Sequence, residues 1–150
     1  MNTKEQAYND YIDSLGLEHI SGKEMVAYSR RTRYSKSSGR YVAAGIPPKT
    51  KWDNLPETLF LVDAVRRYYG KPVTITSAYR CPAYNKLCGG ATQSWHMQGY
   101  AIDFVIKGIS PKLVRNLLLK WRQAGKFKGG LGRYNTFTHV DTRGYNATWG

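Results

Sequence analysis

Two short segments, SWHMQGYAIDF and FTHVD, carry the residues of this sequence whose types and spacing are best suited to catalysis. The chain has only three histidines, and these segments contain two of them, His96 and His139. Eight of its ten acidic residues lie in the first 63 positions, and the other two, Asp103 and Asp141, lie within seven residues of these histidines. The second half of the chain thus keeps carboxylates only beside imidazoles, and this is where we look for chemistry.

Two neutral imidazoles and one carboxylate form a set of three ligands that suits zinc and leaves the fourth tetrahedral position open for water, as in catalytic sites. A metal held in this way lowers the pKa of its water toward about 7 and polarises a carbonyl group. His96, Asp103 and His139 are the predicted ligands, and Gly99 allows a sharp turn between the first two. On the residues alone, a cluster of ordinary hydrogen-bonded groups remains the alternative.

The segments around these residues predict an α+β fold. Apolar residues at helical spacing, with capping signals, indicate helices over residues 3–17, 21–28, 56–69 and 110–124. Segments rich in β-branched and alternating residues indicate strands over residues 72–76, 100–106 and 137–141. We therefore expect a small antiparallel sheet that carries the zinc site, flanked by helices, with a helical N-terminal portion.

The remaining segments are predicted to be irregular. Residues 29–51 are basic, contain no acid and are rich in Gly, Ser and Pro, which indicates an exposed basic loop. Residues 77–95 are predicted to form an ordered loop, with room for a helical turn, and GGLG at 129–132 a turn. Cys81 and Cys88 could form a short disulfide, but a cytoplasmic product without a leader is expected to keep them as free thiols. Their spacing does not suit a structural zinc pair.

Length and composition favour one globular domain. A chain of 150 residues with 41% hydrophobic residues suits a single domain over 1–150, with residues 1–50 as a helical and basic-loop extension packed on the core. We expect a monomer. No stretch is apolar enough for a transmembrane helix, and the polar N-terminus lacks the pattern of a secretory signal, so we expect synthesis in the host cytoplasm.

The formal net charge of +13 indicates a polyanionic partner. Nucleic acid, anionic cell-wall polymers and membrane surfaces all meet this electrostatic description. No helix-turn-helix, zinc-finger or RNA-recognition signature is present, which makes nucleic acid the less favoured of these partners.

The run ITSAYRCPAYNKLCGGATQSWHMQGYAIDF resembles the core signature of the zinc peptidoglycan peptidases. That family includes D-alanyl-D-alanine carboxypeptidases and dipeptidases and phage L-alanyl-D-glutamate endolysins. The residues that match its pattern are Ser77, Tyr79, Arg80, Asn85, Ser94, His96, Gly99, Ala101 and Asp103. The later GGLGRYNTFTHVDTRG resembles the closing segment of the family, which supplies the last ligand as His139, and the likeness covers about residues 20 to 144.

This resemblance implies roles for several residues. It implies that His96, Asp103 and His139 bind zinc and that Arg80 contacts substrate, since a guanidinium suits a peptide carboxylate. The alternative for Arg80 is a structural contact with Asp141 or with a backbone carbonyl group. Ser94 and Gln93 are predicted to hydrogen-bond substrate or to hold the ligand loop, with the loop role favoured.

The sequence departs from the family at the general base. Many members place a Glu or Asp three residues before the last histidine, or a His two residues before it, where this chain has Thr136 and Phe137. Asp141 remains as the candidate base, because residues two apart on a strand share a face. Orienting His139, or pairing with Arg143, is the alternative role.

We therefore expect a zinc-dependent peptidase, either a carboxypeptidase or an endopeptidase, that hydrolyses stem peptides of bacterial peptidoglycan. The basic loop 29–51 is expected to hold it on anionic wall polymers. The missing leader and the resemblance together favour a phage or prophage enzyme of lysis, or a virion component, that acts at the cell wall. The alternatives are a non-catalytic, zinc-containing module that binds cell wall and, less favoured, a basic nucleic-acid-binding protein.

Overall fold

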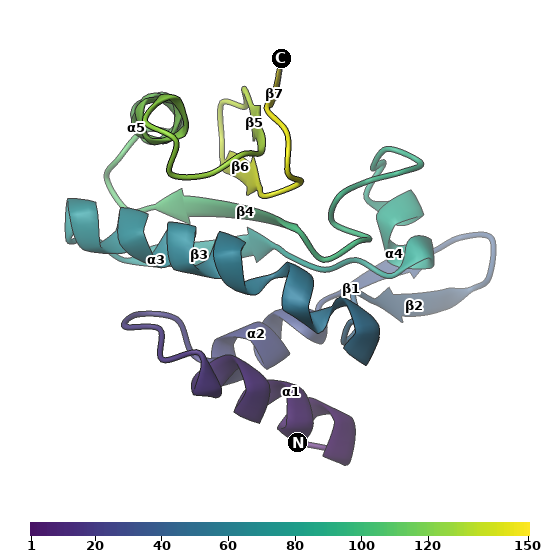
Figure 1. Ribbon diagram of the computed structural model, residues 1–150. Coiled ribbons are helices and arrows are strands. Elements are labelled where there is room, and N and C mark those ends of the chain that lie inside the picture. Colours follow the sequence, from purple (N-terminus) through teal and green to yellow (C-terminus); the bar gives the residue numbers. More distant parts are fainter.

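The computed structural model describes residues 1–150 and confirms the α+β fold. Its helices are α1 (Thr3–Ser14), α2 (Gly22–Ser29), the 3-10 helix η1 (Lys49–Asn54), α3 (Pro56–Tyr69), α4 (Pro82–Leu87) and α5 (Pro111–Gln123). Its strands are β1 (Thr32–Ser35), β2 (Arg40–Ala43), β3 (Val73–Ser77), β4 (Ala101–Ile106), β5 (Gly130–Gly132), β6 (Thr138–Asp141) and β7 (Ala147–Trp149). In Figure 1, α3 runs alongside β3 and β4, α1 and α2 lie beneath them, and α5 lies on the opposite side.

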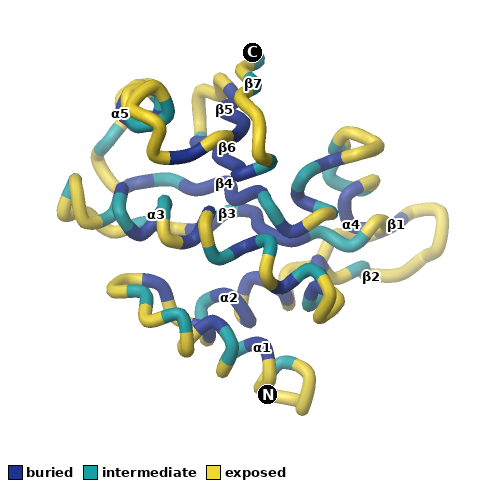
Figure 2. The backbone as a smooth tube through the Cα atoms, in the orientation of Figure 1, coloured by how far each residue is buried: buried dark blue, intermediate teal, exposed yellow.

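Five strands form the main sheet, in the order β3-β4-β6-β5-β7. All neighbours are antiparallel except β5 and β7, which are parallel. The middle of this sheet, β4 and β6, is almost entirely buried (Figure 2). A functional group placed there is therefore held by strands on both sides and shielded from solvent.

One hydrophobic core joins the sheet to the helices, including the N-terminal ones. A single cluster of 23 buried residues contains Ile12 of α1, Leu59 of α3 and Phe104 of β4, each with no measurable exposure. Helix α3 begins at Pro56 and ends before Gly70, which has a φ of 63°, as the sequence predicts. No helix in this fold is both long and apolar enough to cross a membrane.

The prediction of an irregular basic loop over 29–51 is wrong. Residues 32–43 form the hairpin β1–β2, and the segment ends within η1. Tyr34 and Tyr41 lie opposite each other in the hairpin with their rings 5.2 Å apart, and Gly39 turns the chain with a φ of 67°. Cross-strand aromatic packing thus stabilises a segment whose Ser, Gly and Arg content hides its strands.

The prediction of a turn at GGLG is also wrong, because residues 130–132 form strand β5. Glycine is disfavoured in strands, so the pattern contains no strand signal. Strand β7 is not predicted by the sequence either, and it extends the sheet beyond β5. Both errors concern the last two strands of the sheet, β5 and the edge strand β7, where pairing partners decide whether a short segment is a strand.

Candidate metal centre

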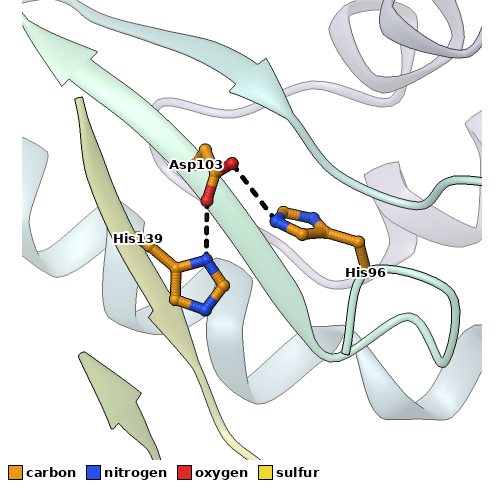
Figure 3. A group of neighbouring side chains, drawn as sticks. All are labelled: His96, Asp103 and His139. Atoms are coloured by element: carbon orange, nitrogen blue, oxygen red, sulfur yellow. Dashed lines mark hydrogen bonds and ion pairs between the residues drawn. The ribbon is translucent and has the colours of Figure 1, made fainter. Parts of the chain in front are cut away.

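Three buried side chains meet on one face of the main sheet. Asp103 on β4 lies directly opposite His139 on β6 in the antiparallel register, so both side chains leave the sheet on the same face. His96 comes from the loop that precedes β4. Figure 3 shows both imidazoles directed at the carboxylate, with His139 Nδ1 at 2.8 Å from Asp103 Oδ1 and His96 Nε2 at 3.2 Å from Asp103 Oδ2.

The loop that carries His96 is fixed by its own turns and by η1. Gly99 adopts a φ of 84°, which permits the sharp turn that the sequence predicts between His96 and Asp103. The backbone N–H of His96 donates to Ser94 Oγ at 3.2 Å. The Nζ of Lys51, in η1, donates a hydrogen bond to the carbonyl oxygen of Met97 at 2.8 Å. Hydrogen bonds to the backbone of the loop therefore set the position of the ligand.

The hydrogen bonds of His96 decide which of its nitrogens can bind a metal. Its Nδ1 lies 2.8 Å from the carbonyl oxygen of Ala78, which can only accept, so Nδ1 carries the hydrogen. In the neutral ring Nε2 then has a free lone pair, and this is the atom that faces Asp103. Histidines that bind metals typically donate a hydrogen bond in this way from the ring nitrogen that does not bind the metal.

His139 shows the same arrangement with its nitrogens exchanged. Its Nε2 lies 2.9 Å from Oδ2 of Asp141, and its Nδ1 faces Asp103. Burial by itself raises the pKa of Asp141, but hydrogen bonds from Arg143, His139 and the Gly130 amide lower it well below its usual range. When the single hydrogen of the neutral ring is on Nε2 and bonded to Asp141, Nδ1 presents its lone pair to Asp103.

Two imidazole nitrogens and a carboxylate thus converge, and the three potential ligand atoms lie within 4.8 Å of one another. Burial by itself raises the pKa of Asp103, but the adjacent His96 and His139 hold that pKa well below its usual range. Burial lowers the pKa of His139, whereas its hydrogen bonds to Asp103 and Asp141 keep it above the ordinary value. The site therefore favours a positive charge among these groups, and its donor set suits zinc.

Asp141 lies beyond the His139 ring, on the side away from Asp103. Its side chain is fully buried, and Oδ1 accepts from the Gly130 amide at 2.9 Å and from Arg143 Nε at 2.8 Å. Oδ2 accepts from Arg143 Nη2 at 2.8 Å as well as from His139. Both carboxylate oxygens are thus engaged by groups of this chain.

Aromatic rings surround the guanidinium of Arg143. Its carbon lies 4.9 Å from the ring centre of Trp95, 5.1 Å from that of Trp149 and 5.6 Å from that of Tyr145. These cation–π contacts hold the ion pair with Asp141 at the edge of the site. Sequence reasoning misses both tryptophans, and Trp149 carries no signal because β7 itself is not predicted.

Glycines of β5 make room for this arrangement. A Cβ atom on Gly130 would lie 2.5 Å from Asp141 Oδ2, and one on Gly132 would lie 2.5 Å from the Tyr134 ring. Only residues without a side chain allow the carboxylate and the ring to approach β5 so closely. The function of the GGLG motif is therefore to supply space within a strand.

The residues predicted to bind substrate line the cavity beside the three ligands. Arg80, Gln93 and Ser94 contribute to its wall, and the cavity has a volume of about 360 Å³. Arg80 does not pair with Asp141: its Nε donates to Ser77 Oγ at 3.0 Å, and its Nη2 lies 3.6 Å from Asp103 Oδ2. Asp103 is the only carboxylate among the lining residues.

The two positions where the family has its general base hold no acid or base in the structure. Thr136 is exposed, and Phe137 lines the cavity with its ring stacked on Tyr134 at 4.3 Å between centres. Cys81 and Cys88 are both free thiols.

Comparison with known proteins supplies a family. The model of the family described as Peptidase M15 matches residues 25–141. Two curated relatives, each named peptidoglycan L,D-endopeptidase MepK, come from Escherichia coli (strain K12) and Shigella flexneri. Each is 37% identical over 79 residues, which cover 48% of this chain and 41% of the relative, so the chain matches about two fifths of their length. No solved structure gives a significant match.

Proposed function

The chain belongs to the Peptidase M15 family of zinc-dependent peptidases, and from this premise we propose that it hydrolyses stem peptides of bacterial peptidoglycan. The observation that carries the proposal is the buried group of His96, Asp103 and His139, whose potential ligand atoms converge. The relatives named as peptidoglycan endopeptidases support this choice of substrate. An endopeptidase is favoured over a carboxypeptidase for the same reason.

In this proposal His96 Nε2, His139 Nδ1 and a carboxylate oxygen of Asp103 hold the zinc. When bound, zinc supplies a Lewis acid and an activated water for attack on an amide carbonyl. The chain orients this site through the bonds of the other ring nitrogens, from His96 to the Ala78 carbonyl and from His139 to Asp141. Burial of all three ligands keeps bulk water from competing with these contacts.

We assign to Asp141 the positioning of His139. Its Oδ2 lies 2.9 Å from Nε2, the nitrogen that does not face Asp103. Its remaining contacts are with Arg143 and the Gly130 amide, which hold the carboxylate against the sheet. The general-base role predicted for Asp141 requires one of these oxygens to leave its partners, and this difference between the two roles is tested below.

Arg80 is proposed to bind a carboxylate group of the substrate. Ser77 and Asn85 accept from its Nε and Nη1, at 3.0 and 3.3 Å, so the guanidinium is oriented before substrate arrives. It lines the cavity directly beside Asp103. Ser94 has its Oγ occupied by the His96 amide, which favours the loop role, whereas Gln93 is exposed and free to meet substrate.

Replacing Arg80 by lysine keeps the charge but removes the planar fork. We expect KM for a stem peptide to rise about tenfold to a hundredfold, which is the effect of losing a charge-assisted hydrogen bond, with zinc content unchanged. Arg67→Lys on the exposed face of α3 is the matched control and should leave KM unaltered. Steady-state kinetics of both variants decides the assignment, and an unchanged KM for Arg80→Lys contradicts it.

Removal of the metal tests the proposed function itself. Incubation of purified cell walls with the protein should release new amino groups and lower the turbidity. A chelator should abolish this release, and added zinc should restore it. Zinc bound at about one ion per chain without any release of amino groups, on walls of several stem-peptide chemistries, would identify the non-catalytic wall-binding module instead.

That second candidate has one observation in its favour. Asp103 is the only carboxylate that lines the cavity, so no free acid stands beside the ligands as a general base. Three finer expectations stay predictions: a phage or prophage source, a place in the virion, and wall-polymer binding by the basic hairpin β1–β2. The exposed side chains of Arg33 and Arg40 on that hairpin are available for such binding.

A further inference from the structure

A second cavity, of about 320 Å³, lies between the start of α5 and the segment that follows β5. Its wall contains three cations, Lys112 and Arg115 from α5 and Arg133 after β5, and no acidic residue. Ser110 and Asn135 add polar side chains to these cations. A cavity with this lining suits an anionic group.

None of the three cations has a partner of opposite charge. No ion pair joins Lys112, Arg115 or Arg133 to any carboxylate, and the acids nearest in sequence, Asp103 and Asp141, are buried in the metal centre. The N-terminus of a helix favours negative charge, yet the first turn of α5 contains no acid and carries Lys112. The three cations therefore lie together without a counter-charge from this chain.

Arg115 adds an independent observation. Its Nε is the one buried side-chain nitrogen or oxygen in the structure that has no hydrogen-bond partner. A buried donor without a partner is costly, and native proteins keep few of them. Arg115 thus keeps a donor that no group of this chain accepts, in a side chain that also lines the cationic cavity.

The cavity adjoins the metal centre. Tyr134 lines both cavities, and Gly132, which lines the cationic one, pairs directly with His139 across β5 and β6. The Tyr134 ring is held in place by Phe137, which stacks on it, and by Trp149, whose Nε1 donates to the hydroxyl oxygen at 2.9 Å. A peptide bound at the metal centre can therefore extend past Tyr134 into the cationic cavity.

We propose that this cavity is a subsite for a carboxylate group of the peptide substrate, formed by Arg115, Arg133 and Lys112. The inference rests on the proposed peptidase function and adds a specificity element to it. In the strand order, Arg80 follows β3, the ligands Asp103 and His139 lie on β4 and β6, and Gly132 lies on β5. The reacting bond would thus lie between Arg80 on one side and the cationic cavity on the other. Two such anchors fix both the register and the direction in which an acidic peptide binds.

Paired substrates test this subsite. One stem peptide carries a free carboxylate on the side of the scissile bond away from Arg80, and its match carries a carboxamide there. For the free acid, Arg115→Gln and Arg133→Gln should each raise KM about tenfold and leave kcat nearly unchanged, while KM for the amide should not move. Lys120→Gln, which removes an exposed cation from the same helix outside the cavity, is the control.

A binding measurement accompanies the kinetics. Titration with acetate should shift the side-chain NMR resonances of Arg115 and Arg133 with saturation in wild type, and the Arg115 shift should be lost in Arg133→Gln. Inorganic phosphate is the second probe: saturation by phosphate with none by acetate would assign the cavity to a phosphate-bearing polymer and overturn the proposal.

The results separate this inference from the peptidase function. If Arg115→Gln and Arg133→Gln raise KM equally for the acid and the amide, or if Lys120→Gln raises KM as much, the cavity acts only through general surface charge. Either result contradicts the subsite. Such an outcome leaves the peptidase function standing, because wild type still cleaves both peptides. If wild type cleaves neither peptide, the proposed function fails, whereas the acetate titration still tests the anion site. Arg133 is exposed, so its variant is expected to fold even if Arg115→Gln does not.

Discussion

Replacing His139 by alanine is expected to remove zinc binding and peptidase activity together. The substitution deletes one of three ligands, and the two that remain, His96 and Asp103, cannot close the site. Because a catalytic metal contributes several kcal/mol to the transition state, activity should fall at least about a thousandfold. Zinc content by atomic spectroscopy and amine release from cell walls measure the two effects.

Loss of folding must be separated from loss of the site in this variant. His139→Ala also leaves the buried carboxylates of Asp103 and Asp141 without their shared partner, which destabilises the fold. Asp103→Asn, a nearly isosteric change, should lose zinc as well while circular dichroism shows a folded chain. His19→Ala removes the histidine that lies outside the site and should keep both zinc and activity. Full activity in a folded Asp103→Asn protein would contradict the metal centre.

Replacing Asp141 by asparagine should weaken zinc binding far more than it slows the reaction at saturating zinc. The carboxylate that orients His139 through Nε2 becomes a neutral amide, and loss of such a partner lowers metal affinity about tenfold to a hundredfold. Stability should fall by about 3 kcal/mol, because Arg143 loses its charged partner inside the protein. The zinc dissociation constant, kcat at saturating zinc and urea unfolding provide the three readouts.

The same variant decides between positioning and general-base catalysis. If Asp141 is the base, kcat should fall about a hundredfold to ten-thousandfold even at saturating zinc, with zinc affinity unchanged. That result would overturn the positioning role. Asp63→Asn is the matched control, since Asp63 is likewise buried, accepts the backbone N–H groups of Glu18 and His19 at 3.0 and 2.8 Å, and does not line the cavity. It should lower stability without changing zinc affinity.

The three ligands can be selected from the sequence because chemistry restricts them. Histidine is rare in this chain and acids are nearly absent from its second half, so residue type and position reduce the candidates to His96, Asp103, His139 and Asp141. The family resemblance then selects the first three as ligands. The helices with clear caps are also predictable: Pro56 and Gly70 bound α3 where local signals place its ends. Such signals depend on neighbours in sequence alone.

The role of Asp141 cannot be read from the sequence. Its spacing of two from His139 puts both side chains on one face of a strand, as predicted, and this placement is compatible with either role. Which ring nitrogen of His139 faces Asp103, and which faces Asp141, depends on how the ring is turned. That orientation follows from Arg143, the Gly130 amide and the aromatic rings around them, which come from three separate segments.

The sequence by itself determined the fold class and the family and selected the three residues of the candidate metal centre, because residue types and motif spacings encode them. Only the tertiary structure decided that GGLG is a strand, that β7 brings Trp149 to the site, and that Arg115 and Arg133 share a cavity with no acid. The physical reason is the same in each case. Strand pairing at a sheet edge, the close approach of rings to glycines and the meeting of like charges all depend on segments that are distant along the chain.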